Sequence, residues 1–347
     1  MKLKDQVRAS CSLLLVMSGC NLFVKSKLLK AIRWIFRLWF IVCCALLFKG
    51  VVNKVTEQHL SLSVLAYASY WFGIVVSGGS LIFRRNRLEA LISSLIHNLT
   101  YEDLKRWRNL IGFVNVSITT CYLIECALIN FIYFIVHPVP DPSHHNGRLL
   151  FVFASIPSNW IPCTCGFYLI MIKLLFLYHK SLLLDSVKRL SSGRIEFEVI
   201  SKRARLLRHS SREFDRLFSV FPFLWFFFGI LGVPGALAVL VHSSGADLLL
   251  SVFFLIRNTL VPVLVALPLS IDQLSLFDIV DQAHDLMMIH HTEGTSDCLL
   301  YIRELDSIKS IKFTGLSFFT LDKSFIMSYI GTALTFAALI STYTNYI

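Results

Sequence analysis

The sequence predicts an all-α integral membrane protein with seven transmembrane helices, a cytoplasmic N-terminus and an extracellular C-terminus. Of its 347 residues, 55% are hydrophobic and only 16% are charged, which leaves too few polar side chains to cover a soluble domain of this size. Long apolar stretches recur along the chain. The Lys and Arg residues, which give a formal net charge of +11, gather in alternate connections between these stretches.

Seven stretches are long enough to cross a membrane, since the hydrocarbon core is about 30 Å thick and a helix rises about 1.5 Å per residue. None alternates apolar and polar residues as the strands of a membrane β-barrel do, so each is expected to be a helix. The predicted spans are Trp34–Val52, His59–Phe83, Leu110–Val136, Leu149–Ile172, Leu217–His242, Leu248–Ile271 and Ser324–Ile347.

The distribution of Lys and Arg sets the orientation of these spans. The N-terminal segment carries eight, and the second, fourth and sixth connections carry six, eleven and four. The other connections hold only Lys49, Lys54 and Arg148. Because short basic connections stay in the cytoplasm, the N-terminus is expected inside and the C-terminus outside, opposite to a G-protein-coupled receptor. The positive charge is thus a topology signal, and we expect no nucleic-acid partner.

The N-terminal run Cys11–Cys20, which follows Lys2, Lys4 and Arg8, imitates a signal peptide. Cleavage there would invert every later connection against its charge, so we interpret the run as an amphipathic helix on the membrane surface.

Two long cytoplasmic stretches, 173–216 and 272–323, have near-helical apolar spacing and opposite charge. We expect them to extend the neighbouring spans as helices and to pack as an anchor bundle. The chain would then form a single seven-helix domain over 1–347.

Asp278, Asp281 and Asp285 share one helix face, and an acidic cluster beside a membrane can hold Mg²⁺ in a membrane enzyme. A second such motif, which membrane prenyltransferases need, is missing, so a solvated helix face is the favoured interpretation. The nine Cys residues form no paired CxxC clusters. We therefore expect no metal site, no cofactor, no disulfide framework and no enzymatic activity.

Glu125 in the third span and Arg257 in the sixth are the strongly charged residues inside the spans, where a charge is costly unless it is paired or hydrated. They are candidates for a structural ion pair, for ligand contact, or for proton or substrate coupling in a secondary transporter.

Aromatic and polar side chains converge in the outer halves of several spans, a mixture that suits a small amphipathic ligand but also occurs in interfacial aromatic belts. With the two charged residues, the candidate ligand-binding set is Tyr67, Tyr70, Trp71, Tyr122, Glu125, Tyr133, Asn159, Trp160 and Arg257.

The last predicted span and the residues before it carry a motif. Phe318-Phe319-Thr320-Leu321-Asp322 is followed by Gly331, then Thr335-Phe336, then Thr342-Tyr343. This order and spacing resemble the insect gustatory receptor family, whose closing helix carries Thr-Tyr, five apolar residues and Gln-Phe. Three of the four signature positions differ, because Phe336 stands for Tyr, Thr342 for Gln and Tyr343 for Phe. The resemblance is that of a divergent member or a receptor-like relative.

Members of that family look like tetrameric ligand-gated cation channels with a central pore lined by the last helix. The resemblance implies a homo- or hetero-tetramer in the plasma membrane of sensory neurons, in contact with membrane lipid, and an outward-opening pocket for a small-molecule tastant. It makes Thr335, Phe336, Thr342 and Tyr343 the candidate pore and gate residues. Hydroxyl groups recur along this apolar helix, and hydroxyls can hydrate a pore that apolar rings close.

Overall fold

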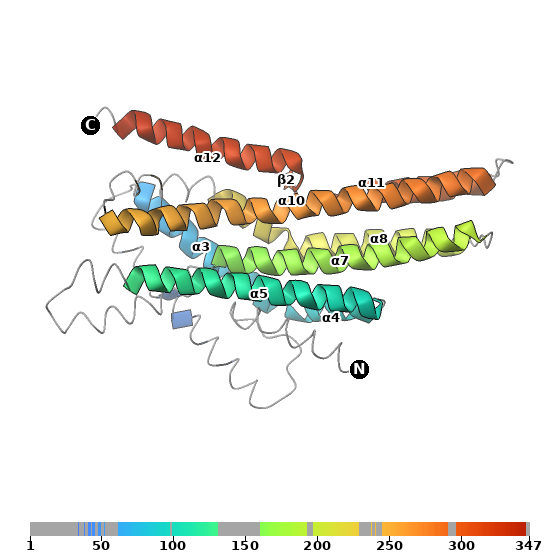
Figure 1. The fold of residues 1–347 in the computed structure, drawn as a ribbon, viewed down its shortest axis with the longest axis horizontal. Coiled ribbons are helices and arrows are strands. Elements are labelled where there is room, and N and C mark those ends of the chain that lie inside the picture. Colours follow the sequence, from blue (N-terminus) through green and yellow to red (C-terminus); the bar gives the residue numbers. More distant parts are fainter. Residues whose placement is uncertain are drawn as a thin grey trace.

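A computed structural model describes residues 62–97, 99–130, 160–192, 197–228, 245–290 and 296–344, together with single positions between 34 and 52 and at 237 and 240. Nearly all of these residues are helical, which confirms the all-α fold class. The elements, labelled as in Figure 1, are α3 (Leu62–Phe83), α4 (Arg85–His97), α5 (Tyr101–Asn130), α7 (Trp160–Ser191), α8 (Phe197–Phe218), α10 (Gly245–His290), α11 (Ser296–Lys309), β1 (Thr314–Gly315), β2 (Phe319–Thr320) and α12 (Lys323–Thr344).

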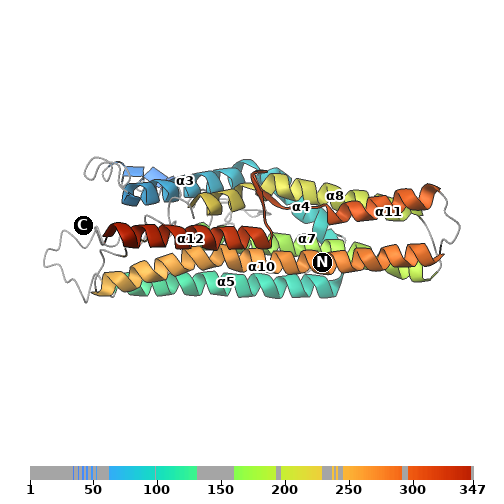
Figure 2. The same cartoon turned by 90° about the horizontal axis from the view of Figure 1, so that it is seen from above.

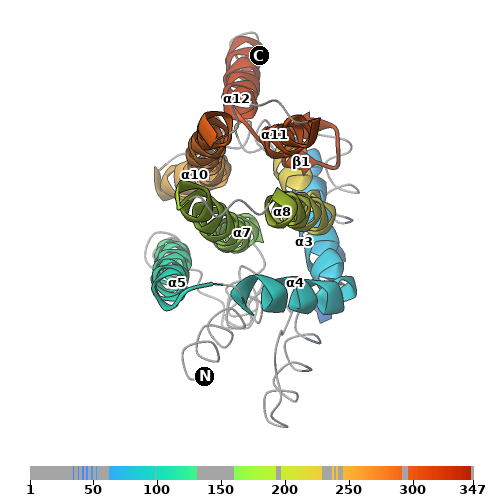
Figure 3. The same cartoon turned by 90° about the vertical axis from the view of Figure 1, so that its right-hand side faces the viewer.

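The helices form one elongated bundle, and α10 runs along almost its whole length (Figures 1 and 2). α3 and α12 occupy the end at which α10 begins, while α8 and α11 occupy the end at which α10 finishes. We call these the α12 end and the anchor end. Viewed along the bundle, α7 lies between α5, α8 and α10 (Figure 3).

α7 is the core helix of the bundle. Consecutive apolar side chains from Ile170 to Ile172 and at Leu174 and Leu175 are all fully buried. Because consecutive positions on a helix point in different directions, burial of all of them means that α7 is covered on every side. One of its backbone carbonyls is also used, since the Trp107 indole N–H on α5 donates to the carbonyl of Ile170 over 2.9 Å.

α8 is amphipathic, and its buried residues show which face meets the bundle. Ile200, Ala204, Leu207 and Phe214 are buried at intervals of three, four and seven residues, whereas Lys202 is exposed. This is the period of a helix with one apolar stripe.

α8 ends at Phe218, and after a single turn residue, Ser219, helical structure covers residues 220–228. Backbone hydrogen bonds continue across this point, from the Ser219 N–H to the Asp215 carbonyl (2.8 Å) and from the Phe223 N–H to the Ser219 carbonyl (3.4 Å), while Pro222 has no N–H to donate to the Phe218 carbonyl. Arg84, between α3 and α4, covers the end of α8 by donating from Nη1 to the carbonyls of Arg216 (2.6 Å) and Leu217 (3.1 Å). The predicted fifth span thus lacks one backbone hydrogen bond near its start.

α10 has 46 residues and is continuous across the predicted end of the sixth span. It contains Pro262 and, at its middle, Pro268, which cannot donate to the carbonyls of Asn258 and Leu264. The part of α10 after Pro268 contains no proline.

Charged side chains join the helices at the anchor end, where two ion pairs link the basic stretch to the acidic one. Lys173 Nζ lies 2.5 Å from Asp272 Oδ2, and Arg205 Nη2 lies 3.2 Å from Glu304 Oε1. Each such partly exposed pair contributes at most about 1 kcal/mol. Two further pairs, Arg203 with Asp185 and Lys309 with Asp281, connect α8 to α7 and α11 to α10.

Within the described ranges, one helix is long and apolar enough by itself to cross a membrane, over Ile161–Ser191 in α7, and a shorter apolar helix covers Trp71–Phe83. The most apolar window of the longer helix is 83% buried inside the bundle.

Candidate functional site

The predicted ligand residue Trp71 has a structural contact on α3. Its indole N–H donates to the carbonyl of Cys44 over 3.0 Å, and its ring lies 5.2 Å from that of Phe48. Trp71 therefore ties the first predicted span to the second. Tyr67 and Tyr70 lie on the same helix, and the structure describes only their backbones.

The other predicted ligand residues are distributed over three helices. Tyr122 is half-buried on α5. Glu125 on α5, Trp160 at the start of α7 and Arg257 on α10 have described backbones only. Tyr133 and Asn159 lie outside the described residues. The ligand-binding role of this set, and the pairing of Glu125 with Arg257, stay predictions.

The acidic face of α10 is solvated. Asp278, Asp281 and Asp285 are all exposed, and Asp281 accepts a hydrogen bond from Lys309. Among the residues that the structure describes, no three His, Cys, Asp or Glu side chains gather closely enough to hold a metal ion.

A β-hairpin connects α11 to α12. β1 and β2 pair antiparallel, with Thr314 opposite Thr320 and Gly315 opposite Phe319. A side chain at Gly315 would collide with the Phe319 ring, because a Cβ there would lie 2.3 Å from Cζ. The turn residues Leu316 and Ser317 have φ of 49° and 65°, the left-handed values of a type I′ turn.

Asp215, on α8, fastens this hairpin to the anchor end. Its Oδ1 accepts a hydrogen bond from the Thr314 backbone N–H (2.7 Å), and its Oδ2 accepts one from Thr314 Oγ1 (2.9 Å). Burial raises the pKa of Asp215, although the two hydrogen bonds oppose this effect.

Asp322 caps the start of α12. Its Oδ1 accepts from the backbone N–H groups of Ser324 (2.9 Å) and Phe325 (3.1 Å), and its Oδ2 accepts from Thr320 Oγ1 (2.8 Å). Partial burial raises its pKa, but these hydrogen bonds outweigh it and hold the pKa of Asp322 below its usual value. Helix capping gives a physical reason for the Asp of the C-terminal motif, for which the sequence alone suggested no function.

Aromatic rings fix the base of α12 to the helix of residues 220–228. The Phe319 and Phe325 rings are stacked with centroids 5.0 Å apart, and Phe226 lies 4.9 Å from Phe319. Sequence reasoning missed Phe226 because its contacts come from distant parts of the chain.

We call this set the α12 base: Asp215, Phe226, Thr314, Phe319, Asp322 and Phe325. It joins α8, the hairpin, the helix of residues 220–228 and the first turn of α12.

No protein-family model matches the sequence, and a search of curated proteins finds no match. Solved structures do match. The structure of the insect olfactory receptor OR5 from Machilis hrabei in complex with eugenol aligns with a TM-score of 0.78 at 14% sequence identity, covering 99% of this chain and 99% of that chain. The chain has the insect olfactory receptor fold. The structure of OR5 from Machilis hrabei gives a TM-score of 0.77 at 14% identity over 98% of both chains.

In this insect olfactory receptor fold, α12 lies at the edge of the bundle beside α10 (Figures 1 and 3). Its apolar side chains Met327 and Leu334 are 71% and 65% exposed. Thr335 is exposed as well, and its hydroxyl donates back to the carbonyl of Gly331 over 2.8 Å. The remaining pore candidates, Phe336, Thr342 and Tyr343, are on α12, and their side chains are outside the described part.

Proposed function

We propose that this chain is a subunit of a chemosensory receptor of the gustatory type, which binds a small molecule and opens a cation pore. The observation that carries this proposal is the whole-length match to the insect olfactory receptor fold, combined with the gustatory-type motif on the last helix. The fold match alone covers insect chemoreceptors in general, and the motif supports the gustatory assignment.

A multi-pass position in the membrane agrees with the surface of α5. Phe113, Val116 and Leu123 are 60–70% exposed within the third predicted span. Large apolar side chains on the outside of a bundle are expected where the surrounding solvent is lipid. We place the receptor in the plasma membrane of sensory neurons, as the family resemblance implies.

The pore would lie along α12. A helix at the edge of a subunit that exposes Met327, Leu334 and Thr335 offers both an apolar surface for neighbouring subunits and hydroxyl groups for a water-filled path. In a homo- or hetero-tetramer, four such helices would surround a common axis. Thr335, Phe336, Thr342 and Tyr343 are the proposed pore and gate residues.

The ligand pocket would open outward at the α12 end, among the aromatic and charged residues of the predicted set. The OR5 structure in complex with eugenol shows that this fold holds a small organic molecule in that protein. We propose a small-molecule tastant as the ligand here.

Whole-cell current tests the proposal directly. Cells that express the full chain would be given sugars, bitter compounds, amines and eugenol, and compared with cells that express Thr342→Ala or Tyr343→Ala. A control variant, Leu206→Ala, removes an exposed apolar side chain from α8 at the anchor end. We expect a ligand-evoked cation current whose ion selectivity or conductance changes in the two α12 variants and not in the control.

A different result would favour the transporter alternative. Saturable uptake of a radiolabelled solute, lost in Glu125→Gln or Arg257→Gln, without any channel current from a chain at the cell surface, would contradict the channel proposal.

A further inference from the structure

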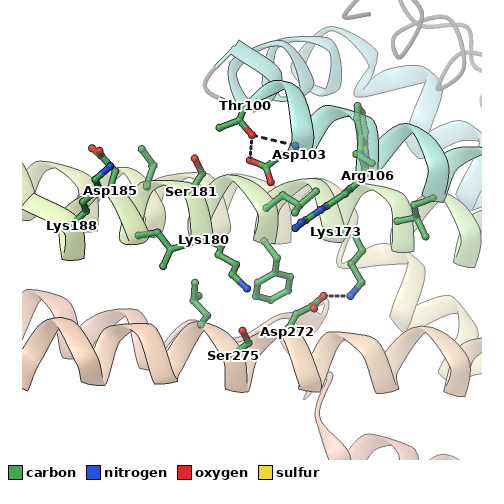
Figure 4. A pocket seen from close by; sticks show the side chains of 17 residues that line it. Thr100, Asp103, Arg106, Lys173, Lys180, Ser181, Asp185, Lys188, Asp272 and Ser275 are labelled. Atoms are coloured by element: carbon green, nitrogen blue, oxygen red, sulfur yellow. Dashed lines mark hydrogen bonds and ion pairs between the residues drawn. The ribbon is translucent and has the colours of Figure 1, made fainter.

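A cavity of about 840 Å³ opens between α5, α7 and α10, away from the predicted ligand pocket and from the α12 base (Figure 4). One end of it lies at the level of the predicted cytoplasmic membrane boundary, and from there it extends along α7 into the cytoplasmic part of the bundle as far as Lys188. Leu110, the first residue of the third predicted span, lines it, and so do Lys173 and Asp272, which directly follow the fourth and sixth spans. The cavity therefore faces the headgroup layer of the inner leaflet in the proposed receptor.

The lining of the cavity offers a ligand more unpaired basic side chains than unpaired acidic ones. Arg106, Lys180 and Lys188 line the cavity, are exposed, and have no acidic partner within the described part of the chain. Two of the three lining carboxylates are already neutralised, because Asp272 pairs with Lys173, and Asp185 pairs with Arg189 and Arg203.

The third lining carboxylate, Asp103, belongs to the start of α5. Its Oδ2 accepts a hydrogen bond from Thr100 Oγ1 over 2.6 Å, and its backbone N–H donates to the same hydroxyl over 3.2 Å. This mutual capping holds the carboxylate at the rim. One acid then remains against three cations, so the cavity attracts anions.

The arrangement of the cations suits one ligand group held between helices. Lys180 extends from α7 toward α10, and Arg106 extends from α5 toward α7 (Figure 4). The Lys173–Asp272 ion pair lies in the lining of the same space. Guanidinium and ammonium groups arranged in this way match the oxygens of a phosphate group.

Apolar side chains make up much of the remaining lining. Trp107, Phe176 and Leu276 form a buried part of the wall, whereas Leu110 and Leu177, which lie near the predicted membrane boundary, are partly exposed. A soluble phosphate compound would leave Leu110 and Leu177 in contact with water, whereas a lipid would cover them with the first part of an acyl chain.

We propose that this cavity binds the phosphate headgroup of an anionic phospholipid from the cytoplasmic leaflet. Arg106 and Lys180 bind the phosphate oxygens, Lys188 supplies further positive charge, and the apolar wall takes the first part of an acyl chain. The bound lipid contacts α5, α7 and α10 together. The membrane placement rests on the proposed function, and the phosphate chemistry rests on the cavity itself.

Ligand-dependent thermal stability of the purified full chain in detergent tests this proposal. The probes are dioctanoyl phosphatidylinositol 4,5-bisphosphate, dioctanoyl phosphatidylcholine and inositol 1,4,5-trisphosphate. We expect the bisphosphate lipid to raise the unfolding midpoint with a saturable dose dependence, and phosphatidylcholine and the soluble trisphosphate to do so weakly or not at all. Equal midpoint shifts with inositol trisphosphate would overturn the lipid assignment.

The double variant Arg106→Gln/Lys180→Gln should weaken this lipid binding on the order of 30-fold, since each cation near an anionic lipid contributes about a factor of five. The matched control is Lys105→Gln/Lys202→Gln, which removes the same charge from exposed positions that do not line the cavity. Identical binding by the two double variants would overturn the proposal.

Two controls distinguish a loss of lipid binding from misfolding and from a failure of the proposed channel function. The unfolding midpoint without lipid shows whether each variant is folded, and the single variant Lys180→Glu serves if the double variant is not. Binding is measured without any current, so a silent chain that binds the lipid contradicts the channel proposal alone, and a conducting chain that does not bind it contradicts this proposal alone.

Discussion

Asp215 accepts two hydrogen bonds from one residue, Thr314, at the start of the hairpin that leads into α12. The two residues are far apart in sequence, so this contact fixes the hairpin to α8 rather than to its own neighbours. Burial opposes the charge of the carboxylate, as its raised pKa indicates. The two hydrogen bonds from Thr314 offset this cost. Asp215 therefore needs both the backbone N–H and the hydroxyl of Thr314 to hold the hairpin in place.

We expect Asp215→Ala to lower the free energy of unfolding by about 2 kcal/mol, because it leaves the Thr314 backbone N–H without its acceptor. Thr314→Val removes only the hydroxyl bond and should cost about 1 kcal/mol. Thermal or denaturant unfolding of the purified protein measures both. In the double variant the two losses should not add, and full additivity would show that the two side chains act independently.

Asp322 should make the free energy of unfolding depend on pH, and the variant Asp322→Ala should reveal this dependence. Its folded-state pKa is lowered, so its contribution is complete above the unfolded pKa near 4 and is lost as the pH falls through the folded pKa. Asp322→Ala should cost about 1 kcal/mol at pH 7. The difference from the unsubstituted protein should shrink below about pH 4. Asp278→Ala, on the exposed face of α10, is the control, and an equal loss there would contradict the capping role.

At the scale of elements, α5 and α7 approach closely at Gly166. A Cβ added there would lie 2.7 Å from Val114 Cγ1 and 2.8 Å from Ile118 Cδ1. On α5, Gly112 is different, because nothing lies within 4 Å of the same added atom. The two glycines thus separate close packing from the intrinsic cost of glycine in a helix.

Gly166→Ala should lower the unfolding midpoint, since the α5 side chains must move and overpacking typically costs about 1–3 kcal/mol. Gly112→Ala should leave the midpoint unchanged or raise it, because alanine favours the helix by up to about 1 kcal/mol. Thermal unfolding of the two variants side by side measures the difference. Equal shifts would show that α5 and α7 do not meet at Gly166.

The sequence predicted most of the described helices, but α4 (Arg85–His97) lies in a connection for which no helix was predicted. Apolar length and charge indicated α3, α5, α7, α10 and α12, and the 3.6-residue period indicated α8. The hairpin before α12 was not predicted, because Leu316 and Ser317 adopt positive φ without the Asn or Gly that usually signals such a turn. The local irregularity at Ser219 was also not predicted, although Pro222 is visible in the sequence, since proline alone does not show how far a helix is disturbed.

The ligand-binding role of the predicted residues stays a prediction, and the contacts of the α12 base could not be predicted from the sequence. The partners of Trp71 and Asp215 are 27 and 99 positions away. Such long-range pairs form when the helices pack against each other. Short sequence motifs do not reveal which helices pack together.

At the scale of the whole molecule, the two ends of the bundle differ in chemistry. The anchor end carries the interhelical ion pairs, and α12 runs from the middle of the bundle to the opposite end (Figure 2). Charged links of this kind are stable in water and costly in lipid. The anchor end is therefore expected in the cytoplasm, and the end of α12 on the outer side.

Epitope tags at the two termini test this orientation. We expect a C-terminal tag to be stained on intact cells and an N-terminal tag only after permeabilisation. The reverse pattern would contradict the distribution of Lys and Arg as a topology signal.

α10 combines continuity with two missing backbone hydrogen bonds, at the carbonyls of Asn258 and Leu264. A helix bends most easily where backbone hydrogen bonds are already missing. Bending of α10 is therefore expected between Asn258 and Pro268. The part of α10 after Pro268 contains no proline and is therefore expected to be stiffer. In the proposed receptor, a ligand that contacts Arg257, which directly precedes Asn258, would tilt the first turns of α10 while the part after Pro268 stays in place.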